Sequence, residues 1–186
     1  MLRLREKYKK EVIPAMMEKF GYKNIMAVPK IEKVVINTCF GRRVVTATSD
    51  ERKKIGKAVL DDMNLIAGQC LVLTKAKKSI SGFKLREGMP IGAMVTLRGQ
   101  KMYDFLERLI NIVLPRARDF RGLNPDSMDG RGNLSIALKE HIIFPEISAE
   151  KTRFIFGLEI TVVSGTKDKE QGLELLKLLG FPMKAK

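Results

Sequence analysis

The chain has 186 residues, of which 45% are hydrophobic, so we expect one compact domain, 1–186, with a sizeable core rather than a disordered chain. The 35 Lys and Arg against 21 Asp and Glu leave a net charge of +14. This excess indicates a polyanionic partner, because Lys and Arg set against phosphates release condensed counterions. Nucleic acid is the leading candidate, and an anionic membrane surface is the alternative.

The sequence argues against the membrane alternative. Uncharged stretches such as Met63–Thr74 are far shorter than the roughly 20 residues that span a bilayer. The basic N-terminus is followed by no apolar run, so no secretory signal is expected. Cys39 and Cys70 have largely apolar neighbours and are expected to be buried free thiols, which fits a reducing cytoplasm.

Apolar spacing and turn residues predict elements in the order α, β, α, β, β, α, β, β, α. The first helix is expected to kink or start late at Pro14 and to end at Gly21. The second helix follows a capping-box signature at Thr48, and the third begins near Gln100 and is stopped by Pro115. The predicted strands cover residues 31–39, 71–74, 91–98, 134–138 and 158–164, with a basic loop at 41–48 and a last helix at 169–179.

This order predicts an α+β fold. The strands are too few and too hairpin-like for a doubly wound sheet, whereas a mostly antiparallel sheet with helices on one face fits the order. The other sheet face would then be free, and such a face is a ready platform for RNA.

The segment Lys75–Gly88 is the most informative for function. It contains five cationic side chains and one acidic side chain, a density that repels itself unless an anion neutralises it. Serine hydroxyls can donate to phosphate oxygens, and an aromatic ring can stack on an exposed base. Alternatively, the segment is a solvated charged hairpin whose aromatic ring folds back onto the core. The candidate contact residues are Lys75, Lys77, Lys78, Ser79, Ser81, Phe83, Lys84 and Arg86.

A second loop, from Arg118 to Asn133, mixes arginines with aspartates, including Asp119 and Asp129. Mixed signs argue against simple phosphate binding. They indicate a self-braced loop or a protein contact, and the sequence does not choose between the two.

Three uncharged polar residues lie in or beside predicted strands: Asn37, Gln69 and Thr96. Each alone is more often structural, but together they can place donors and acceptors on one sheet face. Catalytic and metal patterns are weak, since His141 is the one histidine and no C-x-x-C or paired-histidine motif occurs. We therefore expect no enzyme activity, no metal and no cofactor.

Several long strings in this chain resemble the bacterial-type large-subunit ribosomal protein number five. The resemblance covers nearly the whole chain, from about Tyr8 to Pro182. It is carried by the strings at residues 74–83, 88–92, 95–98, 114–123, 129–133 and 143–147.

The resemblance implies a ferredoxin-like or RRM-like sheet, a place in the central protuberance of the large subunit, and a cytoplasmic, ribosomal location. It implies that one sheet face binds 5S rRNA and helps attach it to 23S rRNA, with RNA contacts here at Asn37, Gln69 and Thr96, to which we add Lys33 and Arg98. It further implies that the basic hairpin, Lys75–Arg86, reaches P-site tRNA. The loop around Arg116–Asn133 would approach neighbouring ribosomal proteins, including one in the small-subunit head, through Arg116, Arg118, Arg121 and Arg131.

The chain departs from the family pattern in three places. The segment after Gly41 is longer and more basic than the family's acidic start, Leu134 stands where tyrosine is usual, and Ser135-Ile-Ala137 replaces a more Gly-rich pattern. The RNP signature of RRM domains is absent, so paired aromatic stacking on the sheet is not assumed. The alternatives that remain are another basic RNA-binding or RNA-chaperone module, an RNA-processing enzyme, and a membrane or protein scaffold.

Overall fold

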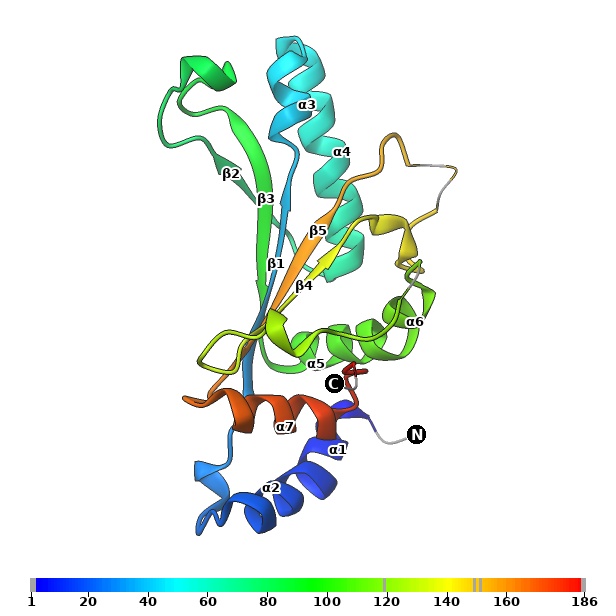
Figure 1. Cartoon of the computed structure of the whole chain (residues 1–186). Coiled ribbons are helices and arrows are strands. Elements are labelled where there is room, and N and C mark those ends of the chain that lie inside the picture. The colour runs from blue at the N-terminus through cyan, green and yellow to red at the C-terminus, as the bar shows by residue number, and fades with distance from the viewer. Residues whose placement is uncertain (1–2, 119, 149, 151, 185–186) are drawn as a thin grey trace. The chain divides into compact units, whose positions relative to one another are not determined.

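The computed structural model describes residues 3–118, 120–148, 150 and 152–184. Its strands form one five-stranded antiparallel sheet with the order β2-β3-β1-β5-β4 (Figure 1). The bounds are β1 Ile31–Cys39, β2 Val72–Lys75, β3 Pro90–Leu97, β4 Leu134–Leu138 and β5 Leu158–Ser164. The predicted α+β class is confirmed, and each predicted strand is present, with the ends of β2 and β3 shifted by one residue.

The helices follow the predicted order along the chain. Their bounds are α1 Leu4–Lys7, α2 Ile13–Phe20, α3 Gly41–Thr46, α4 Ser49–Ala67, α5 Gly99–Arg108, α6 Leu114–Arg116 and α7 Lys169–Leu179. None of the helices in the described residues is both long and apolar enough to cross a membrane.

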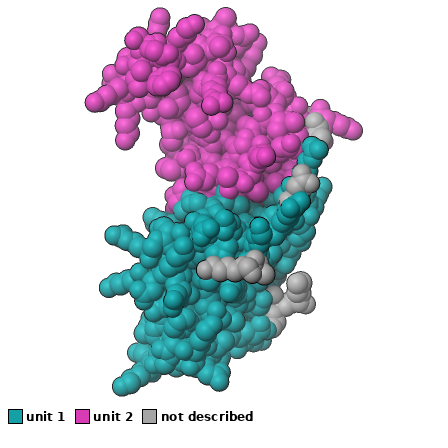
Figure 2. All heavy atoms as spheres, in the orientation of Figure 1, with its two compact units in different colours: residues 1–34, 97–136, 161–186 teal, residues 35–96, 137–160 magenta. Residues whose placement is uncertain are grey.

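The chain divides into two compact units (Figure 2). Unit 1 comprises residues 1–34, 97–136 and 161–186, and unit 2 comprises residues 35–96 and 137–160. The expectation of a single domain, 1–186, stays a prediction.

In unit 1, both helix-interrupting prolines follow a π-helical turn. These turns, Tyr8–Val12 and Leu109–Val113, precede Pro14 and Pro115. A proline ring clashes with the carbonyl four residues earlier in an α-helix, and the wider π turn relieves that clash. The helix therefore passes through Pro14, and the later helix ends at Arg116 rather than stopping at Pro115.

In unit 2, the capping box at the start of α4 is confirmed. The Thr48 N–H donates to Glu51 Oε2 over 2.9 Å, and the Thr48 hydroxyl donates to the same oxygen over 3.0 Å. The helix then buries one side in the core through Val59, Met63 and Ile66.

The prediction of a basic loop at Gly41–Thr48 is wrong, because α3 covers most of these residues. Its short turn of helix is held by tertiary contacts rather than by propensity. Val44 is fully buried, and Arg52 Nε donates to the carbonyl oxygens of Val44 and Ala47 over 3.0 and 2.9 Å. These bonds add a side-chain donor to two carbonyls at the end of α3, where the helix provides few donors of its own.

Strand β1 shows that the sheet has a covered face and an open face. Val34, Ile36 and Thr38 are buried, whereas Asn37 and Cys39 are exposed. This alternation is the two-residue period of a strand with one face packed on the core.

The prediction of buried thiols is wrong. Cys39 and Cys70 are both free and both exposed. Cys39 shares the parity of Asn37 in β1, so it lies on the open face, and Cys70 lies in the connection between α4 and β2.

Candidate nucleic-acid interface

The open sheet face of unit 2 presents uncharged polar groups, as the sequence predicts. Asn37 is exposed on β1, and its amide makes no hydrogen bond within the part of the chain that the structure describes. Gln69 and Thr96 are half-buried and lie together, since Gln69 Nε2 donates to the Thr96 carbonyl over 3.4 Å. The Asn37 amide is thus free for an external partner, and Gln69 is oriented by the sheet.

Apolar side chains on the same face escaped the sequence analysis. Val72 and Met94 are cross-strand partners in β2 and β3, and they are 68% and 41% exposed. Met94 precedes Thr96 by two residues, and this parity is the signal that could have revealed it. An exposed apolar surface beside amides suits the flat faces of unstacked bases and sugars.

Lys33 and Arg98 belong to unit 1. Lys33 is half-buried in β1, and Arg98 is exposed at the residue that precedes α5. Both can therefore present their charged groups to solvent.

The basic segment after β2 is a hydrogen-bonded hairpin rather than a loose loop. Ala76 N–H donates to the Met89 carbonyl over 2.8 Å, and Ile80 and Leu85 exchange two backbone hydrogen bonds of 3.1 Å. Lys84 has φ 51° and is the one non-glycine residue in the described chain with positive φ. This left-handed conformation is strained for a residue with a side chain. It is kept only where the hydrogen bonds and packing around the residue hold the backbone in place.

All the candidate contact residues of this hairpin are exposed. Phe83 has 67% of its surface exposed, so the alternative in which its ring folds back onto the core is wrong. The Ser79 hydroxyl oxygen accepts the Glu87 N–H over 2.9 Å and keeps its own proton to donate. The hairpin thus projects cations, hydroxyls and one aromatic ring into solvent.

The loop at residues 129–133 is braced from within. The Asp129 carboxylate accepts the main-chain N–H groups of Arg131 and Asn133 over 2.9 and 2.8 Å, and the Asn133 side-chain amide over 2.7 Å. Burial raises the pKa of Asp129, but these hydrogen bonds outweigh it and hold the pKa below its ordinary value. Residues 129–133 therefore brace themselves, as one of the two alternatives predicts. The Asp129 carboxylate bonds to amide groups of the loop itself.

The same loop packs against α7 of unit 1. Gly132 and Gly172 approach so closely that a Cβ on Gly172 would lie 2.6 Å from Gly132 Cα. The buried Ser164 hydroxyl donates to the Gly132 carbonyl over 2.9 Å, and the Thr166 hydroxyl donates to the Arg131 carbonyl over 2.7 Å. These bonds fix the loop's main chain, and the Arg131 side chain remains exposed.

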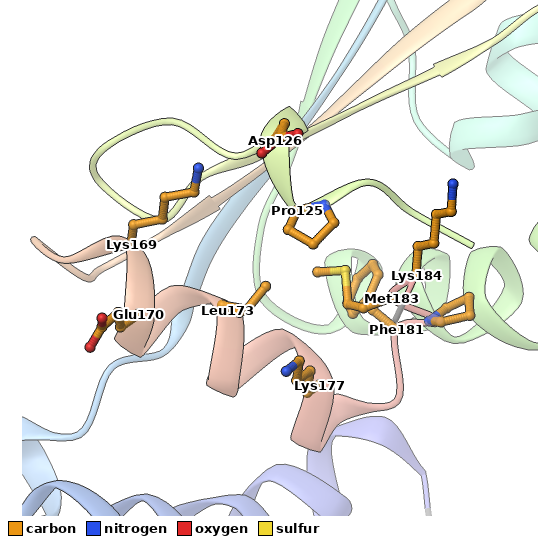
Figure 3. Close-up of a pocket in the computed structure, with 10 residues that line it drawn as sticks. Pro125, Asp126, Lys169, Glu170, Leu173, Lys177, Phe181, Met183 and Lys184 are labelled. Carbon is orange, nitrogen blue, oxygen red and sulfur yellow. The ribbon is translucent and has the colours of Figure 1, made fainter. Parts of the chain in front are cut away.

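The other arginines of the predicted protein-contact loop, Arg116, Arg118 and Arg121, are exposed, and Asp119 lies outside the described residues. Beside this loop, unit 1 has an open hollow of about 980 Å³ that the sequence analysis missed (Figure 3). Pro125 and Leu173 line it, with Lys169, Lys177 and Lys184 among its charged residues.

Family models match almost the whole chain. The model described as Ribosomal protein L5 matches residues 24–86, and a second model, which describes the C-terminus of the same ribosomal protein family, matches residues 90–183. The chain belongs to the ribosomal protein L5 family. The predicted resemblance is confirmed.

Curated relatives in this family extend over the same length. A protein from Thermoanaerobacter sp. (strain X514), named Large ribosomal subunit protein uL5, is 54% identical over 98% of each chain. A protein of the same name from Alkaliphilus oremlandii is 53% identical over 98% of each chain. Another, from Halothermothrix orenii, is 52% identical over 96% of this chain and 97% of its own length.

The L5 family is structural and non-enzymatic, which confirms the expectation that this chain is not an enzyme. The described residues include no group of three or more His, Cys, Asp or Glu side chains arranged to hold a metal ion. His141 is completely buried, with its Nε2 3.4 Å from Asp62 Oδ2, so it has no access to a substrate.

Proposed function

We propose that this chain is a structural constituent of the large ribosomal subunit in the cytoplasm, where it binds 5S rRNA and helps attach it to 23S rRNA. The observation that carries the proposal is the similarity, 54% over 98% of both chains, to a protein named Large ribosomal subunit protein uL5. The net charge of +14 supports an rRNA partner, because it supplies the electrostatic part of binding.

The open sheet face is the proposed 5S rRNA surface. Asn37 offers an amide with no partner among the described residues, and Gln69 and Thr96 add further polar groups on the same unit. Uncharged donors and acceptors read sugar and base edges, whereas cations read phosphates. Lys33 and Arg98 would supply phosphate contacts from unit 1.

The basic hairpin is the proposed contact with P-site tRNA and rRNA backbones. Its support is the exposed set of Lys75, Lys77, Lys78, Lys84 and Arg86, with Phe83 available to stack. The internal hydrogen bonds of the hairpin lower the entropy that is lost when it binds.

The loop from Arg116 to Asn133, called the arginine loop below, is the proposed contact with neighbouring ribosomal proteins, including one in the small-subunit head. Its support is the rigid main chain at residues 129–133, which presents Arg131 outward, and the adjacent hollow lined partly by apolar side chains. Arginine is favoured at protein interfaces because its planar guanidinium can donate two parallel hydrogen bonds to one acceptor group.

The test is a binding assay of the purified chain with 5S rRNA, with tRNA as competitor, over a salt series. We expect 5S rRNA to bind with a steep salt dependence and to resist displacement by an equal amount of tRNA. The alternative, a general basic RNA-binding or RNA-chaperone module, predicts equal affinity for both RNAs. Equal affinity, or no binding of 5S rRNA, would refute the proposal.

A further inference from the structure

A groove in unit 2 is lined by residues of the basic hairpin, of α3 and of the first turns of α4. Two adjoining hollows of about 620 and 510 Å³ form it, and both are lined by Arg52, Arg86 and Met89. The hairpin wall of this groove belongs to the surface already described. The wall formed by α4 was not singled out by the sequence or by the proposed function.

The charges around the groove are one-sided. The larger hollow is lined by Arg52, Lys84 and Arg86, with no acidic side chain among its described lining residues. The smaller hollow adds Lys53 and a single acid, Glu87. Within the described chain, Arg86 and Lys84 make no side-chain hydrogen bond or ion pair. Several cations that face one cavity repel each other, and an anion in the cavity would relieve that repulsion.

Arg52 is positioned before any ligand arrives. Its Nε donates to the carbonyls of Val44 and Ala47, which ties the side chain to the end of α3. The two Nη groups make no hydrogen bond within the described residues, so they remain available at the groove. A guanidinium held in this way can bind a phosphate through two parallel hydrogen bonds with little loss of side-chain entropy.

Hydroxyl groups complete the lining. Ser79 and Ser81 face the larger hollow, and Ser49 faces the smaller one. Serine hydroxyls donate to phosphate oxygens and to ribose hydroxyls, and the apolar side chains of Leu85 and Met89 offer a surface for the sugar. Cations, hydroxyls and a short apolar surface together match the sugar–phosphate backbone of RNA.

We propose that this groove binds a segment of RNA backbone, with Arg52 on α4 and Arg86 on the hairpin contacting phosphates from opposite walls. The inference rests on the proposed rRNA-binding function and extends it to α4. The basic segment after Gly41 then has a role, because Val44 and Ala47 supply the carbonyls that orient Arg52.

The test compares Arg52→Gln with Lys57→Gln in the full chain. Lys57 is an exposed cation on the same helix and lines neither hollow of the groove, so it is the matched control. Binding to 5S rRNA and to 23S rRNA is measured separately over a salt series. For at least one of these RNAs, we expect Arg52→Gln to lower affinity about tenfold. We expect the same change to reduce the salt slope by about one unit per lost phosphate contact. Lys57→Gln should leave both quantities unchanged.

Two further variants protect the test from a folding artefact. Arg52→Gln also removes the bonds to α3, so its thermal unfolding is recorded. Arg86→Gln removes no hydrogen bond of the described structure and should produce the same loss of slope. Arg52→Lys should keep most of the salt slope but lose affinity. A lysine ammonium cannot bond to the carbonyls of α3 and at the same time offer two parallel N–H groups to a phosphate.

The outcomes separate this inference from the proposed function. If Arg86→Gln flattens the salt slope while Arg52→Gln behaves like Lys57→Gln, the hairpin contacts RNA alone and the inference is overturned. If the unmodified chain binds neither RNA, the proposed function itself fails.

Discussion

Asn37 is the residue on which specific RNA recognition depends most in the proposed interface. Its exposed amide should contribute hydrogen bonds to sugar or base edges without releasing counterions. We expect Asn37→Ala to weaken 5S rRNA binding about fivefold, near 1 kcal/mol, with little change in salt slope. Asn111→Ala, at another exposed asparagine, is the control for filter binding or calorimetry. An unchanged dissociation constant for Asn37→Ala would remove this residue from the interface.

Gly172 lies where the packing against Gly132 leaves no room for a side chain. A methyl group there would lie 2.6 Å from Gly132 Cα and 2.8 Å from the Gly132 carbonyl oxygen, so backbone must move. We expect Gly172→Ala to lower the free energy of unfolding by about 1–3 kcal/mol in urea titrations. Gly130→Ala is the matched control, since a Cβ at Gly130 meets nothing within 4 Å. Equal stability of the two variants would contradict this packing.

Residue-level roles were predictable where a local pattern carries them. The Thr48 capping box and the Gly21 helix end follow from a few neighbouring residues, and both are present. The role of Arg52 was not predictable, because it depends on α3 and on a hairpin about thirty residues further along the chain. Cys39 was misjudged from its apolar neighbours, although the strand alternation that exposes Asn37 also exposes Cys39.

The basic hairpin is the element expected to dominate the electrostatic part of binding. Lys77 and Lys78 are exposed neighbours with no partner in the described structure. We expect Lys77→Ala combined with Lys78→Ala to weaken rRNA binding and to reduce the salt slope by roughly one unit per lost phosphate contact. A double change at exposed lysines outside the hairpin, Lys9→Ala with Lys10→Ala, serves as the charge-matched control. The same slope for the wild-type chain and the hairpin variant would show that these lysines do not touch phosphate.

The contact between α4 and the segment that includes His141 should make unit 2 sensitive to mild acid. Burial lowers the pKa of His141 below its ordinary 6.5, although nearby Asp62 opposes this shift, and the ring stacks on Phe156 with centroids 3.8 Å apart. Because the folded pKa lies below the unfolded one, the contribution of His141 to the free energy of unfolding is complete above pH 6.5. It is lost as the pH falls below that value toward the lowered folded pKa.

Burial raises the pKa of Asp62, so its effect has the opposite sign: it stabilises the fold as the pH falls through the raised pKa and is complete below the ordinary value of 3.8. His141 is the single histidine of the chain, so a loss of stability just below pH 6.5 can be assigned to this residue. We expect the stability of the unmodified chain to fall as the pH drops below about 6.5, and His141→Phe to remove most of that fall in urea titrations. Parallel pH profiles for the two proteins would contradict this assignment.

At the level of elements, the strands were predictable because their alternation and β-branched content are local. Helix α3 was not, since Gly41-Arg-Arg-Val-Val-Thr lacks a capping signature and is rich in β-branched residues, which are poor helix formers. Burial of Val44 and the bonds from Arg52 decide its conformation. The π-helical turn before Pro14 was also not predictable, since it depends on the helix continuing beyond the proline to bury Met16.

At the scale of the whole molecule, the net charge of +14 favours a polyanionic partner. The hairpin and the groove beside α4 gather cations with few acidic partners, whereas the open sheet face of unit 2 carries amides and apolar side chains. In the proposed function, phosphate contacts would supply the association rate and most of the affinity, and the sheet face would distinguish the correct RNA.

Oxidative footprinting of the full chain with 5S rRNA tests the sheet-face interface most directly. Met94 on the open face and Met26, outside the proposed interface, are 41% and 84% exposed and can both react with radicals in the free protein. We predict that 5S rRNA slows the oxidation of Met94 and leaves that of Met26 unchanged. Protection of Met26 with full reactivity of Met94 would show that 5S rRNA binds elsewhere on the chain.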